Sequence, residues 1–354
     1  MITARTDRLV AHLEGLGSDA VLVTGAANRR YLSGFTGTAG VLLIAASDRC
    51  LVTDSRYTDQ ARRQATGFEV VEDSDTLRKT AVWIAEHSIR RLGIEVEHTT
   101  VKRHGALIEC LAGLRNPPEI VLLDGVIEAQ RAVKDVSELA TIREAVRLAD
   151  DIMARADESI GVGVTERELA TDLEHRMRQI GGDGPAFPTI VASGVNAAMA
   201  HHEPGEDKIV SGVPIVVDLG VRLDGYCSDI TRTFILGPPD DVFKDVYAIV
   251  LEAQLAVESR MRAGMTGREA DDLARKVIID ANFGANFGHG TGHGVGLEVH
   301  ESPRLSPQGA NVLMPGAVTS VEPGIYLRGW GGIRIEDLVV VGDNGVEVLT
   351  QATK

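Results

Sequence analysis

The sequence predicts a mixed α/β protein with two domains, and three observations support this prediction. The chain has 354 residues, which is more than most single domains contain. Its first third alternates short apolar runs with helix-like segments, as a small α/β domain does. The remainder combines longer helical segments with apolar strands that carry acidic residues. We therefore expect one domain at residues 1–126 and a second at residues 127–354.

The spacing of apolar residues assigns regular elements along the first domain. Leu9, Val10, Leu13 and Leu16 recur at helical spacing within residues 1–20. The run Asn116-Pro-Pro118 breaks regular structure near the end of the domain. The expected strands are 20–24, 41–45, 50–53, 93–97 and 120–123, and the further helices are 59–65 and 77–91.

The second domain contains two similar helical units about a hundred residues apart. The first begins with a helix that Ser137 can cap and that extends to about residue 159. A second helix follows in each unit, and a Thr-x-x-Glu capping box marks its start at Thr165 and again at Thr266. This similarity indicates an internal duplication, with capped helices at residues 165–179 and 266–281.

Composition and charge exclude several classes of protein. A formal net charge of −15 argues against a nucleic-acid partner, because phosphate binding requires a basic surface. No stretch approaches the ~20 apolar residues of a membrane span, and the N-terminus lacks the apolar core of a signal peptide. Cys50, Cys110 and Cys227 have neither disulfide-framework nor zinc-ribbon spacing. We therefore expect a cytoplasmic protein whose partners are neither nucleic acids nor membranes.

Residues 287–300 form a glycine-rich run with three histidines, His289, His293 and His300. Glycine lets the backbone approach a ligand closely, so such a run seldom serves packing alone. In an extended segment His289 and His293 face one way, and His300 faces the other way unless a bend intervenes. The alternative is a flexible glycine loop with incidental histidines.

Two acidic residues, Asp218 and Asp229, interrupt apolar strand-like runs on either side of a turn-forming Asp-Gly pair. A hairpin folded about residues 223–224 places the two acids opposite each other. Buried carboxylates side by side repel each other, and a cation is the simplest remedy. Alternatively, one of them pairs with Arg222 or Arg232.

Glu322 and Glu336 lie in two later apolar runs, and Arg334 shares a face with Glu336. An Arg334–Glu322 ion pair is the structural alternative here. Four buried acids and a glycine-framed histidine exceed what one ion needs, so we expect two divalent ions. Such ligands suit Mn²⁺, and also Co²⁺, Fe²⁺ or Zn²⁺.

In order and local context, five of these residues resemble the metal ligands of the pita-bread metallopeptidases: Asp218, Asp229, His293, Glu322 and Glu336. That group contains aminopeptidase P, prolidase and methionine aminopeptidase, and also creatinase, which needs no metal. Residues 28–40 and 53–61 resemble the N-terminal domain of the proline-directed members, so the resemblance covers essentially the whole chain. It implies a pita-bread catalytic domain with pseudo-twofold duplication, preceded by a smaller creatinase/prolidase-type α/β domain.

The resemblance also implies a role for each site residue. A hydroxide bridging the two ions would attack the scissile carbonyl, with Glu322 as general base. His201 and His300 correspond to the family's substrate-facing histidines, and the neighbouring His202 leaves the first assignment open by one residue. The positions that correspond to further substrate contacts are His289, Arg334 and Arg304.

Within the family, the runs at residues 35–40 and 54–57 favour an aminopeptidase P that cleaves Xaa-Pro bonds of short peptides. The alternative is an Xaa-Pro dipeptidase (prolidase), in which Arg304 holds the C-terminal carboxylate. Some prolidases, however, place that arginine at the position of Gln308. A non-catalytic peptide-binding module is a remote third reading, because such modules usually lose ligands and none is lost here. The resemblance further implies a homodimer.

Overall fold

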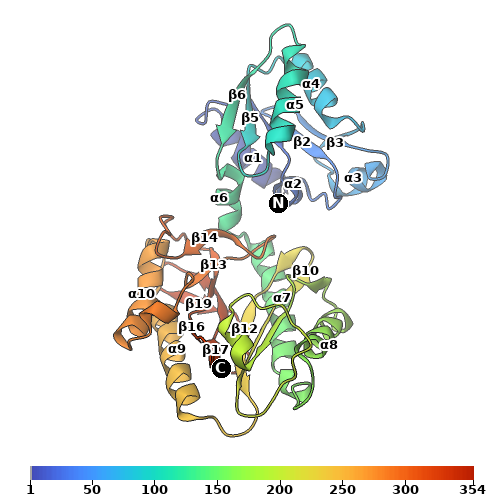
Figure 1. Ribbon diagram of the computed structural model, residues 1–354. Helices are drawn as coiled ribbons and strands as arrows, with labels where there is room; N and C mark the ends of the chain where they lie inside the picture. The colour runs from blue at the N-terminus through green and yellow to red at the C-terminus, as the bar shows by residue number, and fades with distance from the viewer. Residues whose placement is uncertain (1) are drawn as a thin grey trace. The chain divides into compact units, whose positions relative to one another are not determined.

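The computed structural model describes residues 2–354, which form two compact units that divide between Arg131 and Ala132 (Figure 1). The boundary expected after residue 126 falls at the start of helix α6 (Val126–Ala132). Most of α6 belongs to the first unit, because its Glu128 and Arg131 side chains both hydrogen-bond Asn28 there. Within the described range, no helix is long and apolar enough to cross a membrane.

Residues 2–131 form a six-stranded sheet covered by helices. Its elements before α6 are α1 (Ile2–Leu13), β1 (Ala20–Val23), α2 (Ala26–Ser33), β2 (Val41–Ala45), β3 (Arg49–Thr53), α3 (Thr58–Gln64), β4 (Glu69–Glu72), α4 (Thr76–Glu86), β5 (Arg91–Glu95), α5 (Val101–Ala112) and β6 (Glu119–Leu123). The strand order is β4-β3-β2-β1-β5-β6, in which β2 runs antiparallel to both its neighbours. Leu22 and Leu43 share a core with Trp83 of α4 and Leu107 of α5. The five predicted strands are therefore present, whereas β4, α2 and α5 are additional.

Residues 132–354 contain two helix pairs, each packed on its own group of antiparallel strands (Figure 1). The helices are α7 (Val136–Met153), α8 (Glu166–Gln179), α9 (Asp241–Arg260) and α10 (Gly267–Asp280). The strands are β7 (Gly184–Pro185), β8 (Ile190–Ser193), β9 (Pro214–Leu219), β10 (Val221–Leu223), β11 (Tyr226–Cys227), β12 (Ile230–Ile235), β13 (Gly292–Gly294), β14 (Glu301–Leu305), β15 (Val318–Val321), β16 (Gly324–Leu327), β17 (Gly331–Arg334), β18 (Asp337–Val341) and β19 (Val346–Val348). Leu173 of α8 shares a core with Val217 of β9, and Ile278 of α10 shares another with Val339 of β18.

Matching backbone contacts confirm the internal duplication. Thr165 and Thr266 cap α8 and α10 with complete capping boxes, as predicted. Each threonine also forms an isolated bridge to a later segment, at Lys208 and Val312 respectively. The residue after each threonine donates its backbone N–H to the same later segment: Glu166 to the carbonyl of Asp207 and Gly267 to that of Asn311, both at 3.0 Å. The two halves therefore place equivalent helices in equivalent positions.

Helix α7 begins earlier than predicted, because its cap is Asp135 and not Ser137. Asp135 Oδ1 accepts the backbone N–H groups of Ser137 and Glu138 at 2.9 and 3.0 Å. Glu138 in turn accepts the backbone N–H of Asp135 at 3.0 Å. A closed capping box satisfies more helix-terminal donors than a single serine hydroxyl does, so it decides where the helix starts.

The hairpin that carries Asp218 and Asp229 turns at Asp224-Gly225, one residue later than predicted. Both turn residues have positive φ, 44° and 76°, as a two-residue type I′ turn requires. In consequence, Asp218 lies opposite Thr231 and not opposite Asp229. Because the register differs by two residues, Asp229 stays on the face of Asp218.

Candidate active site

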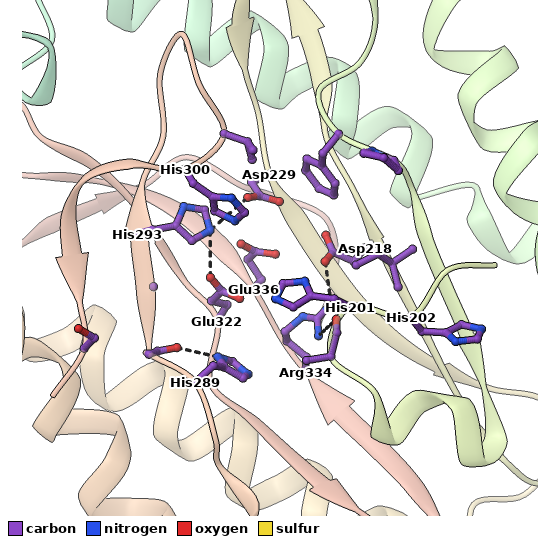
Figure 2. Close-up of a pocket in the computed structure, with 18 of the residues that line it drawn as sticks. His201, His202, Asp218, Asp229, His289, His293, His300, Glu322, Arg334 and Glu336 are labelled. Atoms are coloured by element: carbon purple, nitrogen blue, oxygen red, sulfur yellow. Dashed lines mark hydrogen bonds and ion pairs between the residues drawn. The ribbon is translucent and has the colours of Figure 1, made fainter. Parts of the chain in front are cut away.

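The five predicted ligands line a single pocket of about 700 Å³ in the second unit (Figure 2). Asp218 lies on β9 and His293 on β13, whereas Asp229, Glu322 and Glu336 lie just before or after a strand. The same pocket is lined by all the other predicted site residues: His201, His289, His300, Arg304 and Arg334.

The ligand atoms lie close enough together to share bound ions. One side-chain atom each of Asp229, His293 and Glu336 lies within 4.8 Å of the other two. His293 Nε2 is 3.1 Å from Glu322 Oε1 and 3.7 Å from Asp229 Oδ2. The Oδ1 atom of Asp218 is buried and has no hydrogen-bond partner in the described part of the chain. A buried carboxylate oxygen without a donor is suited to coordinate a cation.

The carboxylates of the pocket carry more negative charge than its protein groups balance. Burial raises the pKa of Asp229 well above its usual range, and the nearby charges of Glu336 and Asp218 add to this effect. Burial and the charge of Glu322 likewise raise the pKa of Glu336. Burial also raises the pKa of Glu322, but the hydrogen bond with His293 and the nearby charges of His293, His289 and Arg334 together lower that pKa to about 2. This donor set therefore fits divalent cations.

A second histidine–carboxylate cluster, in the first unit, differs because protein donors already occupy its oxygens. Glu95 accepts the backbone N–H of Gly25 at 2.8 Å and the amide of Asn28 at 2.7 Å. Glu128 is hydrogen-bonded to His98 at 3.0 Å and also accepts from Asn28. This cluster is a satisfied hydrogen-bond network, whereas Asp218 of the second unit keeps a free buried oxygen.

Arg334 pairs with Asp218 at 2.6 Å, so the alternative ion pair with Glu322 is wrong. Arg334 also donates to the hydroxyl of Tyr326 at 2.9 Å, and His289 Nε2 lies 2.8 Å from the same hydroxyl. Tyr326 is therefore a partner of two pocket residues that the sequence pattern did not indicate. No local signal identifies it, because the chain leaves one sheet after Val321 and enters another at Gly324.

His201 and His202 both line the pocket, but the ring of His201 points toward the carboxylates, whereas the ring of His202 points away from them (Figure 2). The Nε2 atom of His202 lies 2.7 Å from a carboxylate oxygen of the buried Glu166. The rings of His293 and His300 meet with their centroids 4.3 Å apart. The chain bends back after β13, so that β14 pairs antiparallel with it and brings the two histidines together.

Comparisons with known proteins match both units of the chain. Residues 140–343 match metallopeptidase family M24, and residues 5–133 match the creatinase/prolidase N-terminal domain. The chain is 35% identical to an Xaa-Pro dipeptidase of Pyrococcus horikoshii over 100% of its own length and 99% of that protein.

Solved structures are similar over the same extent. An Xaa-Pro dipeptidase from Bacillus anthracis has a TM-score of 0.96 and 40% identity, covering 100% of this chain and 99% of the other. An X-Pro aminopeptidase from Thermotoga maritima has a TM-score of 0.89 and 36% identity, covering 99% and 98%. The family match spans more than half of the chain, and the pita-bread resemblance is confirmed. The chain therefore belongs to metallopeptidase family M24.

Proposed function

We propose that this chain is an Xaa-Pro dipeptidase, which hydrolyses the single peptide bond of dipeptides that end in proline. Arg304 is the observation that carries the proposal. Its side chain is exposed at the wall of the metal pocket and forms no ion pair with any described residue. A free guanidinium at this place is suited to hold the C-terminal carboxylate of a dipeptide.

This proposal replaces the expectation of an aminopeptidase P. The Pyrococcus horikoshii and Bacillus anthracis proteins, both named Xaa-Pro dipeptidases, match this chain over essentially its full length. Aminopeptidase activity is the second candidate function, because the chain is also similar to an X-Pro aminopeptidase from Thermotoga maritima. One wall of the pocket contains Phe187, Pro188 and Ile190, an apolar surface that suits a proline-containing substrate.

We further propose that the ligands hold two divalent ions, most suitably Mn²⁺, which when bound polarise the scissile carbonyl and acidify water. We assign Glu322 as the general base, because its carboxylate lines the pocket beside the other ligands, where it can accept a proton from water. His201 and His300 reach the pocket from opposite walls and donate hydrogen bonds to the substrate.

The test compares an Xaa-Pro dipeptide with an Xaa-Pro-Yaa tripeptide, using Mn²⁺-loaded protein. We expect faster cleavage of the dipeptide, loss of activity on chelation, and recovery with Mn²⁺. Arg304→Gln should raise KM for the dipeptide roughly 10- to 100-fold, because it removes one charge-assisted hydrogen bond to the substrate. The change in kcat should be small.

Arg328→Gln is the matched control, because Arg328 is exposed and does not line the pocket. It should leave both parameters unchanged. Preference for the tripeptide, unaffected by Arg304→Gln, would favour the aminopeptidase, and full activity of metal-free protein would contradict metal-dependent hydrolysis altogether.

A further inference from the structure

Glu166, the first residue of α8, has an exposed fraction of 0% and lies against the segment 193–205 that carries His201. A carboxylate removed from water requires hydrogen-bond donors in place of the solvent. Among residues 2–354, all of the donors to its side chain come from that segment. They are the Ser193 N–H at 2.8 Å and the Asn196 amide at 3.0 Å on Oε1, with His202 Nε2 at 2.7 Å and the Gly205 N–H at 3.2 Å on Oε2.

Because Ser193 and Gly205 bound the segment, one side chain holds both of its ends. Between them lies a short 3₁₀ helix (Gly194–Ala198), in which Val195 is 60% exposed, and the following Met199 is 50% exposed. A segment with so few buried apolar side chains depends on its anchors for a defined conformation.

The orientation of His201 follows from the contacts on either side of it. His202 is turned toward Glu166, and Figure 2 shows the ring of His201 directed into the pocket instead. On the other side, the carbonyl of Ala200 accepts a hydrogen bond from Arg334 at 3.2 Å, and Arg334 pairs with Asp218. His201 is thus held between two tethers.

The second half of the unit shows that the fold itself does not need a carboxylate at this place. The residue equivalent to Glu166 is Gly267, since each follows the capping threonine and donates its N–H to the matching segment. A Cβ atom at Gly267 would lie 2.0 Å from the carbonyl oxygen of Arg304, so no side chain fits there. The buried carboxylate therefore occurs only in the half that contains His201.

We propose that Glu166 is a positioning residue for catalysis, which acts by holding His201 toward the substrate. The proposal rests on the substrate contact of His201 given under the proposed function. Glu166 touches neither the substrate nor the metal ligands. It acts through the loop ends and through His202.

A double-mutant cycle tests this role in the full-length, Mn²⁺-loaded protein with an Xaa-Pro dipeptide. The variants are Glu166→Gln, His201→Ala and the two combined. Glu166→Gln should lower kcat about 10- to 100-fold, as expected for a misplaced catalytic group, without changing the bound metal. Since Glu166 acts through His201, the combined variant should be no slower than His201→Ala alone. A merely structural role would make the two losses multiply, and that result would overturn the proposal.

Glu168→Gln is the matched control, because Glu168 lies on the same helical turn but bonds only to Thr165. It should lower the melting temperature and leave kcat unchanged.

If Glu166→Gln does not fold, the same cycle with His202→Ala in its place decides the question, since that change removes one of the four donors to Glu166. A wild-type kcat in Glu166→Gln, or in His202→Ala where that variant takes its place, would also overturn the inference. Wild-type kcat in His201→Ala would instead overturn the role of His201 in the proposed function, and the inference with it.

Discussion

Glu322 and Asp229 are both carboxylates of the metal pocket, but their surroundings differ. Glu322 Oε1 accepts a hydrogen bond from the Ser320 hydroxyl at 3.0 Å and lies 3.1 Å from His293 Nε2. Asp229 is buried beside Glu336, and burial with this like charge raises its pKa well above the usual range. Glu322 is thus stabilised as an anion by the protein, whereas ionised Asp229 requires a cation.

This difference predicts distinct effects of two isosteric substitutions. Glu322→Gln should lower kcat about 10²- to 10⁴-fold, because the amide cannot accept the proton, while substrate binding remains measurable. Asp229→Asn should instead lower the metal content. Metal analysis by mass spectrometry, together with kcat on a dipeptide, distinguishes the two. Near-normal turnover of Glu322→Gln would show that another group is the base.

At the scale of elements, helix α10 holds the glycine–histidine run in place. The buried carboxylate of Asp271 accepts the Thr291 N–H at 2.9 Å and the Arg275 Nε–H at 2.6 Å. Arg275 in turn donates to the carbonyl of His289 at 2.7 Å. A Cβ atom at Gly292 would lie 2.1 Å from a backbone oxygen, so glycine here permits close packing of neighbouring strands. The run is anchored, and the alternative of a flexible loop is wrong.

Removal of this anchor should strongly destabilise the second unit. Asp271→Ala leaves Arg275 partly buried without its counter-ion, so we expect a loss of about 3–5 kcal/mol in the free energy of unfolding. Asp280→Ala on the same helix removes only an exposed pair with Lys276 and should cost less than about 1 kcal/mol. Denaturant unfolding at equilibrium measures both. Equal losses in the two variants would contradict the anchoring role.

Helix α6 provides the acid-sensitive contact of the first unit. Burial raises the pKa of Glu128, but its hydrogen bonds with His98 and Asn28 outweigh burial and lower the pKa from 4.5 to about 2. Because the folded state has the lower pKa, ionised Glu128 stabilises the fold above pH ~4.5, and this stabilisation is lost as the pH falls toward ~2.

We therefore expect the cost of Glu128→Gln to depend on pH. The Glu128 side chain keeps 18% exposure, so solvent screening limits the expected cost to about 1–2 kcal/mol at pH 7. The difference from wild type should shrink between pH 4.5 and 2. Chemical unfolding of both proteins at pH 7, 4 and 3 tests this, and a difference that does not change with pH would count against it.

At the scale of the whole molecule, all predicted site residues lie in the second unit, within residues 132–354. The apolar clusters that contain Leu173, Ile278 and Leu338 also consist entirely of residues from that unit. A chain that begins at Ala132 should therefore fold and bind Mn²⁺ with nearly the affinity of the full chain. Calorimetric titration of both chains with Mn²⁺ measures this, and loss of binding would show that the first unit completes the site.

The family resemblance leads us to propose a homodimer. Light scattering of the full chain should give twice its mass of 37.8 kDa. A monomer with full dipeptidase activity would refute this assembly and show that one chain suffices for the reaction.

Local chemistry explains why much of the fold and the ligand set could be predicted. A capping box is complete within four residues, so the starts of α8 and α10 follow from Thr165 and Thr266 alone. A carboxylate in an apolar strand is costly without a partner, so Asp218 and Glu336 could be predicted as candidate ligands before their neighbours were known.

By itself, the sequence determined the two-domain α/β architecture, the duplicated helices and the five candidate ligands, which the structure brings into one pocket. The hairpin register had a local signal in Asp224-Gly225, and the structure shows that a two-residue turn there places Asp218 opposite Thr231. Only the tertiary structure decided that His201 points toward the carboxylates of the pocket, because His202 bonds Glu166 at a separation of 36 residues. This choice has no local signal. It depends on which donors and acceptors the packed elements bring within hydrogen-bonding distance.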